Sequence, residues 1–166
     1  MTQPSNPPPS LDEFILHPSV AAGWWLDYLP YAAQAIQFRT EYLRAGRITV
    51  SCIQDIEFHV LDLLAQEISK VPLGTMTVWP LANDVFRVFQ SMRDEKALAF
   101  VSNRVMARRA FQIAARYGVP FADALYVAAA SGLEKSLILA DRLLYARLLE
   151  IELSGVRVIL LQEHTW

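Results

Sequence analysis

The sequence predicts an α/β fold, a three-layer α/β/α domain built on a central parallel sheet of about five strands. Short apolar runs that suit buried strands alternate with longer segments whose apolar residues recur at helical spacing. The apolar run at 137–140 ends directly on Asp141 and is flanked by such segments, an arrangement typical of parallel strands joined by helical crossovers. The chain shows no internal repeat and no linker that would divide it into two domains.

Each apolar run defines an expected strand, and each periodic segment defines an expected helix. The strands are expected at 14–16, 48–50, 97–101, 137–140 and 156–161, and about seven helices include 31–44, 53–68, 81–92 and 104–117. Ser19 offers a start for the first helix, and Asn103 is expected to cap the helix that Gly118 ends.

Composition restricts the class of protein. The chain has 166 residues, 54% of them hydrophobic, and a net charge of −2, which predicts one packed domain without a general basic coat. No apolar run approaches the roughly 20 residues of a membrane span. The Pro-rich start lacks the basic and apolar regions of a signal peptide, so we expect a disordered arm over 1–11 and the domain over 12–166. The lone Cys52 excludes an intramolecular disulfide framework, favours a small core residue and suits a cytoplasmic setting.

Two short motifs stand in the last third of the chain. Asp-Ala-Leu-Tyr at 123–126 opens an expected helix, and Leu-Ala-Asp-Arg at 139–142 spans the end of an expected strand. Together they resemble the C-terminal half of a PIN domain, in the branch of VapC-like toxin ribonucleases. The expected strands and helices from 14 to 161 follow the order of elements in the PIN pattern. The resemblance implies a metal-dependent endoribonuclease, usually a homodimer and often held by a small antitoxin-like protein partner.

The resemblance also implies a site. PIN nucleases hold a divalent metal in carboxylates at the carboxyl edge of the sheet, and the matching acids here are Glu57, Asp123 and Asp141. Carboxylate oxygens suit Mg²⁺ or Mn²⁺, which would activate water and offset phosphate charge. Each acid also has a simpler interpretation: Glu57 as a partly exposed helix residue, Asp123 as a carboxylate near a helix N-terminus, and Asp141 as an N-cap.

The sequence departs from the PIN pattern at two positions. His17 stands where the family's first strand ends on an aspartate, and Leu139 stands where Thr or Ser often precedes Ala-Asp. Both changes remove oxygen from the implied site. Two interpretations of His17 stay open: an imidazole ligand for a softer metal such as Mn²⁺, or a substituted position in a weakened or inactive site.

Two further groups of residues suggest partners. Arg104 and Arg108 share a helix face at i, i+4 spacing and are candidate nucleic-acid-binding residues, with a solvated face as the alternative. Arg93 lies just upstream in the same basic stretch. The aromatic and apolar excess over 24–42 predicts self-association, with a hydrophobic core as the alternative.

Two functions therefore remain. The first is a PIN-like endoribonuclease that uses Mg²⁺ or Mn²⁺ and is weakened by the loss of its first acid. The second is a catalytically inactive PIN-fold module that binds RNA or a protein partner. Neither involves a membrane.

Overall fold

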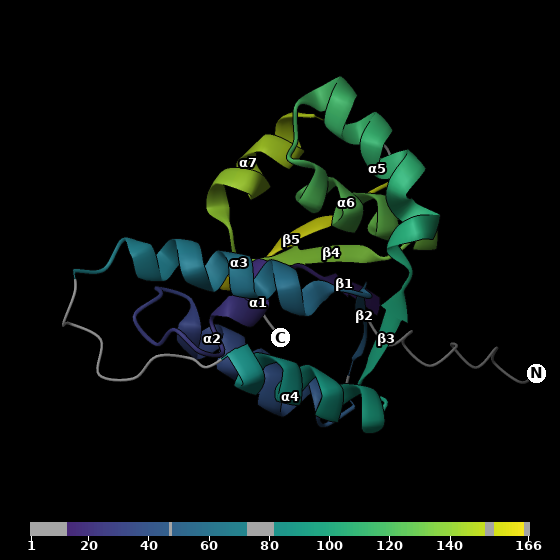
Figure 1. The fold of residues 1–166 in the computed structure, drawn as a ribbon. Coiled ribbons are helices and arrows are strands. Elements are labelled where there is room, and N and C mark those ends of the chain that lie inside the picture. Colours follow the sequence, from purple (N-terminus) through teal and green to yellow (C-terminus); the bar gives the residue numbers. More distant parts are fainter. Residues whose placement is uncertain (1–12, 47, 73–81, 152–154, 165–166) are drawn as a thin grey trace, which may run out of the picture.

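The computed structural model describes residues 13–46, 48–72, 82–151 and 155–164 (Figure 1). The predicted disordered arm at 1–11 lies outside these residues. Among the described residues, no helix combines the length and apolar character that crossing a membrane requires.

A five-stranded parallel sheet forms the centre of the fold, which confirms the predicted α/β class. The strands follow the spatial order β3-β2-β1-β4-β5. Their bounds are β1 (Glu13–Leu16), β2 (Thr49–Ile53), β3 (Leu98–Val101), β4 (Ser136–Leu139) and β5 (Val158–Leu160). Phe14 of β1 is in register with Val50 of β2 on one side and Ser136 of β4 on the other. Two strands distant in the sequence, β1 and β4, are therefore neighbours at the centre of the sheet.

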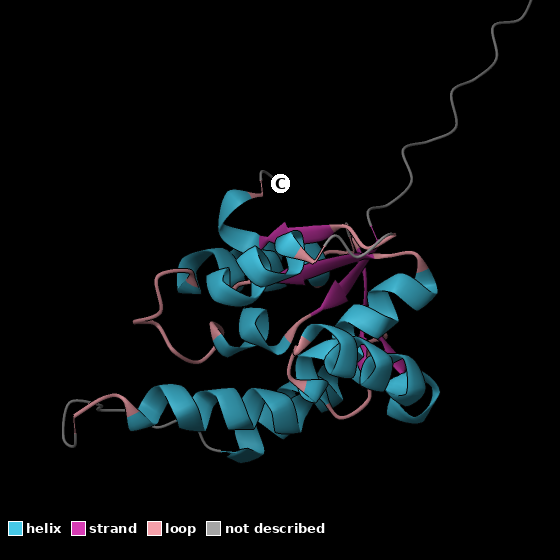
Figure 2. Cartoon of the chain, turned by 90° about the horizontal axis from the view of Figure 1, so that it is seen from above, coloured by secondary structure: helices cyan, strands magenta, loops and turns pink. Residues whose placement is uncertain are grey.

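Helices cover both faces of this sheet. In Figure 1, α5, α6 and α7 lie on one side and α1, α2 and α4 on the other, and Figure 2 shows the strands from above, partly overlaid by helices. The helices are α1 (Pro18–Ala22), α2 (Ala32–Gln37), α3 (Ile56–Ser69), α4 (Ala82–Asp94), α5 (Asn103–Tyr117), α6 (Phe121–Leu133) and α7 (Arg142–Glu150). Two short segments complete the order: the π-helical η1 (Phe38–Leu43), which continues α2, and the 3₁₀ turn η2 (Leu161–Glu163).

One predicted helix start, at Ser19, and one predicted cap, Asn103, were misplaced. The short helix α1 begins at Pro18, and the imidazole of His17 caps it by accepting the backbone N–H of Ser19. Asn103 is the first residue of α5 and does not cap it, because its side chain donates to the Asp55 carboxylate at 2.6 Å. The end of α5 is as predicted, since Gly118 takes the left-handed conformation with φ of 65°.

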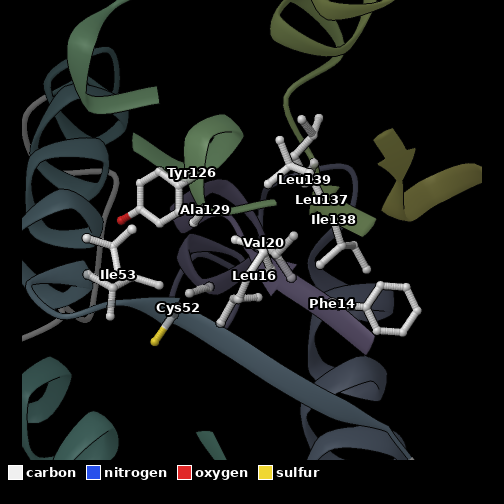
Figure 3. Close-up of a cluster of buried hydrophobic side chains, with 14 of the residues drawn as sticks. Phe14, Leu16, Val20, Cys52, Ile53, Tyr126, Ala129, Leu137, Ile138 and Leu139 are labelled. Carbon is white, nitrogen blue, oxygen red and sulfur yellow. The ribbon is translucent and has the colours of Figure 1, made fainter. Parts of the chain in front are cut away.

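The core lies where β1, β2 and β4 meet helices α1 and α6 (Figure 3). Helix α6 is buried at every position from Ala124 to Ala130, so it is the central helix of its layer. Cys52 is fully buried among these side chains, which confirms its prediction as a core residue, and burial raises the pKa of its thiol.

Part of the aromatic excess near the N-terminus belongs to this interior. Trp24 is only 8% exposed, its ring centroid is 5.7 Å from that of Phe89, and its indole N–H donates to the Ala35 carbonyl. Tyr28 and Ile36 are large apolar side chains of the segment that the structure describes as exposed, at 45% each. The packing therefore accounts for the buried tryptophan without a partner chain, and self-association stays a prediction.

Candidate functional site

The centre of the sheet offers the position at which open α/β folds bind ligands. From β1 the chain proceeds through β2 to β3 on one side, and from β4 to β5 on the other. The carboxyl ends of β1 and β4 therefore form the point where the strand order reverses, and ligands bind in the crevice outside such a point. His17 follows β1, and Asp141 follows β4 after one intervening residue.

His17 joins two segments at this point. Its side chain is 3% exposed, and its Nε2 lies 3.2 Å from Oδ1 of Asp123. Its Nδ1 lies 3.2 Å from the backbone nitrogen of Ser19, which can only donate, so Nδ1 accepts and the ring proton of the neutral imidazole lies on Nε2. His17 therefore donates an N–H to Asp123, and neither ring nitrogen is left with a lone pair for a metal.

Ser19 connects this pair to β4. Its hydroxyl oxygen lies 2.9 Å from Nδ1 of His17 and accepts the backbone N–H of Ala140, also at 2.9 Å. Ser19 is 4% exposed, so these bonds lie in the interior. One continuous hydrogen-bonded chain thus runs from the end of β4 through α1 and His17 to Asp123 in the first turn of α6.

Glu57 has a different partner. It lies in the first turn of α3 but is only 4% exposed, so the prediction of a partly exposed helix residue was wrong. Its carboxylate forms an ion pair with Arg93 at the end of α4. The Arg93 guanidinium also donates to the Gln54 carbonyl at 3.1 Å and lies 4.3 Å from the ring centroid of Phe100. A cation of the chain itself therefore neutralises the buried Glu57 carboxylate.

Asp141 is an N-cap, as the simpler interpretation predicted. Its Oδ1 accepts the backbone N–H groups of Leu143 and Leu144 at 2.8 and 3.0 Å. The residue is exposed and lines a pocket of about 590 Å³ together with Ser19, Tyr31 and residues of α3. Burial, assisted by the charges of Glu67 and Asp141, raises the pKa of Tyr31 to about 12, so the pocket presents a neutral phenol.

A second histidine belongs to the surroundings of Asp123, although no sequence motif pointed to it. Nδ1 of His59 in α3 forms a hydrogen bond with the phenolic oxygen of Tyr126, with a distance of 2.6 Å between the two atoms. The Tyr126 ring lies between the two imidazoles, 5.1 Å from His17 and 5.6 Å from His59. Burial, first of all, raises the pKa of Tyr126 well above its ordinary value, which keeps its phenol protonated.

His59 should make the fold sensitive to acid. Burial, followed by the nearby His17, lowers the pKa of His59, so the folded state holds it neutral while the unfolded chain binds a proton near pH 6.5. This contribution to stability is complete above about pH 6.5 and is lost as the pH falls. We expect the urea midpoint to fall between pH 7.5 and 5.0 by more in the wild type than in His59→Gln, whose side-chain amide can still form a hydrogen bond with Tyr126. An equal fall in both proteins would assign the acid sensitivity to other groups.

The described residues do not present a ready metal centre. They include no group of three or more His, Cys, Asp or Glu side chains arranged to hold a metal ion. A divalent cation such as Mg²⁺ needs free oxygen ligands. Glu57 is paired with Arg93, Asp123 accepts from His17, and one Asp141 oxygen caps α7. These contacts do not fit a divalent metal, while the convergence of the three acids stays a prediction.

Arg104 and Arg108 form no ion pair with these acids in the described part of the chain. Both are exposed on α5. Their assignment to nucleic-acid binding stays a prediction.

Comparison with known proteins places the fold. No family model matches the chain, and no curated protein matches its sequence. The crystal structure of PAE2754 from Pyrobaculum aerophilum superposes with a TM-score of 0.52 at 16% identity, over 89% of this chain and 83% of that one. The chain has a PIN-like fold. VapBC2 from Rickettsia felis, crystallised with a DNA fragment from its promoter, aligns with a TM-score of 0.49 at 12% identity, over 89% of this chain and 97% of that one.

Within this PIN-like fold, the positions singled out from the sequence occupy the expected elements. His17 follows the first strand, Glu57 and Asp123 stand in the first turns of α3 and α6, and Asp141 follows β4. At these positions His17 presents an imidazole to Asp123, and the Arg93 guanidinium reaches the buried Glu57 carboxylate.

Proposed function

We propose that this chain is a PIN-like module that binds RNA without metal-dependent cleavage. One observation carries the proposal: the Arg93 guanidinium forms the ion pair of the buried Glu57 carboxylate, at an acid position where the PIN pattern implies a metal ligand. His17 also disfavours a metal at this site, because it directs an N–H and not an oxygen towards Asp123.

Electrostatics explains why these contacts disfavour a metal. A divalent ion bound by Glu57 would have to displace Arg93 or lie beside its positive charge. Displacement would also remove the guanidinium from the Phe100 ring and the Gln54 carbonyl. Separating a buried ion pair is expensive, since each group must then be solvated or paired anew. Mg²⁺ or Mn²⁺ would supply Lewis acidity and an activated water when bound, but this arrangement gives it little free oxygen.

Two carboxylates that are not fully buried favour a second candidate, a weak endoribonuclease of the VapC-like type that prefers Mn²⁺ to Mg²⁺. The Asp123 side chain is 28% exposed, and Asp141 is exposed at the switch point of the sheet. Rearrangement of His17 could then leave two carboxylates and an imidazole for the metal. Loss of one carboxylate would make cleavage slow, by more than the roughly 10–100-fold typical of changes around a metal site. The homodimer and the antitoxin-like partner implied by the resemblance belong with this candidate.

Binding and cleavage of one RNA, measured together, separate the two functions. We expect a labelled single-stranded RNA to bind with the same Kd, within about twofold, in EDTA, Mg²⁺ and Mn²⁺, and to remain intact. Asp123→Asn, purified in parallel, is the control for contaminating ribonuclease, because the oxygen of the new side-chain amide can still accept the N–H of His17. Cleavage that requires Mn²⁺ and disappears in Asp123→Asn would establish the ribonuclease instead.

A further inference from the structure

Helix α5 exposes a cationic face on the outside of the domain. Its sequence from Asn103 to Tyr117 contains four arginines and no acidic residue. Met106, Ala110 and Ile113 form its buried stripe, and Figure 1 shows α6 between α5 and the sheet. The remaining faces of α5 are largely open to solvent.

Among the described residues, no acidic neighbour balances the positive charges on α5. Within the described residues, none of the four arginines forms an ion pair. Arg109 donates to the Ser131 hydroxyl and Arg116 lies over the Tyr117 ring, but neither contact supplies negative charge. Arg104 stands in the first helical turn, where the helix dipole disfavours a cation, and its i, i+4 partner Arg108 adds like-charge repulsion. The free fold therefore carries a cost that an anionic partner would relieve.

A large apolar ring shares this face. Phe111 is 67% exposed and follows Arg104 and Arg108 at i+7 and i+3, so the three side chains lie on one side of the helix. Val105, 71% exposed, borders them. We call Arg104, Arg108 and Phe111 the α5 face. It combines guanidinium groups, which bind phosphate through two parallel hydrogen bonds, with an aromatic surface on which a base can stack.

We propose that the α5 face is the surface on which this module binds single-stranded RNA. The inference rests on the proposed function and specifies where and how the RNA binds. Arg104 and Arg108 contact successive phosphates, and Phe111 stacks against an unpaired base. A duplex keeps the faces of its bases inside its own stack, so Phe111 favours a single strand. An acidic peptide would satisfy the arginines but offers no equivalent use for Phe111.

The cationic surface extends past the end of α5. Arg147 of α7 is exposed and donates to the Tyr117 carbonyl at 3.4 Å, next to Arg116. The twelve-residue separation of Arg104 and Arg116 corresponds to about 18 Å of helix. This length would accommodate several nucleotides of an extended strand. Because stacking and phosphate contacts are independent of base identity, we expect little sequence preference.

Fluorescence anisotropy with three labelled probes tests the proposal: a 12-nucleotide oligouridine, a 12-base-pair RNA duplex and a glutamate-rich peptide. We expect the wild type to bind oligouridine more tightly than the duplex or the peptide. Arg104→Ala/Arg108→Ala should weaken oligouridine binding at least tenfold and reduce the slope of log K against log salt by about 1.4, or about 0.7 for each lost phosphate contact. Phe111→Ala should weaken binding roughly tenfold while leaving this slope unchanged, within the range of one lost stacking contact.

Matched controls remove an arginine and an apolar side chain at positions outside the α5 face. Arg87→Ala removes an exposed arginine on α4, and Leu149→Ala removes an exposed apolar side chain on α7. Neither should alter oligouridine binding. All these positions are exposed, so circular dichroism should show unchanged folds.

The outcomes distinguish this inference from the proposed function. If oligouridine binds metal-independently and both α5 variants bind like the wild type, the α5 face is overturned while the RNA-binding module stands. If the wild type binds no RNA, both proposals fail. Peptide binding that is stronger than RNA binding and depends on Arg104 and Arg108 would replace RNA with an acidic protein. Equal affinity for single strand and duplex, with no effect of Phe111→Ala, would overturn the single-strand assignment.

Discussion

Replacement of Arg93 with alanine is expected to destabilise the fold by about 3 kcal/mol, the lower end of the range for breaking a buried ion pair. The Glu57 side chain is only 6% exposed, whereas that of Arg93 is 30% exposed and retains some contact with water. Removing the guanidinium leaves a carboxylate in the interior without its counterion and also removes the contact with Phe100. The urea midpoint at pH 7.5 measures the loss.

A control on the same helix isolates the effect of burial. Arg87 pairs with Asp84 at 3.5 Å, but its side chain is 79% exposed. Arg87→Ala should therefore change stability by no more than about 0.5 kcal/mol. Arg93→Ala combined with Glu57→Gln should recover part of the loss, because the buried charge is then absent. If Arg93→Ala were as mild as Arg87→Ala, the ion pair with Glu57 would not be the neutralising contact that we describe.

Replacement of His17 with aspartate is expected to make the stability of the protein depend on a divalent metal. The new carboxylate could still cap α1 through Ser19, but it would stand beside the carboxylate of Asp123, to which His17 now donates a hydrogen bond at 3.2 Å. Repulsion between these groups should cost roughly 2–4 kcal/mol at pH 7.5 without metal. Mn²⁺ at about a hundred times its Kd should restore about 2.7 kcal/mol.

His17→Asn provides the neutral control for this variant. Asparagine can cap a helix and adds no charge, so its thermal midpoint should not respond to Mn²⁺. Asp123→Asn in the His17→Asp background should also abolish the response. Equal midpoints with and without Mn²⁺ in His17→Asp would show that these two positions cannot form a metal site, even with the acid of the PIN pattern restored.

The sequence predicted the features that depend on neighbouring residues. Apolar runs located all five strands within a few residues, because burial on both faces of a parallel sheet demands continuous apolar stretches. The N-cap role of Asp141 followed from its position directly before a helix. The resemblance to the PIN pattern identified His17 and Asp123 as one site, although they are far apart in the chain, and the structure brings them into contact.

The contacts that give the site its character were not predictable in this way. Arg93 belongs to a basic stretch that suggested a solvated surface, and helical periodicity does not reveal how far a long flexible side chain reaches. The same limit concealed the burial of Glu57, whose pairing requires α3 and α4 to pack together. His59 lacked any motif, because its partner Tyr126 is reached only through the packing of α3 against α6. Periodicity also placed one continuous helix over 31–44, whereas the chain changes to a π-helix at Phe38.

Calorimetric titration of the wild-type protein with Mn²⁺ at pH 7.5 tests the central claim most directly. If the contacts of Arg93 with Glu57 and of His17 with Asp123 prevent metal binding, titration with millimolar Mn²⁺ should give no saturable heat of binding. Titration with Mg²⁺ should give the same result. The Asp123→Asn variant should give the same flat titration. Saturable binding of one Mn²⁺ per chain that Asp123→Asn abolishes would contradict the account and restore the metal-dependent ribonuclease as the better description.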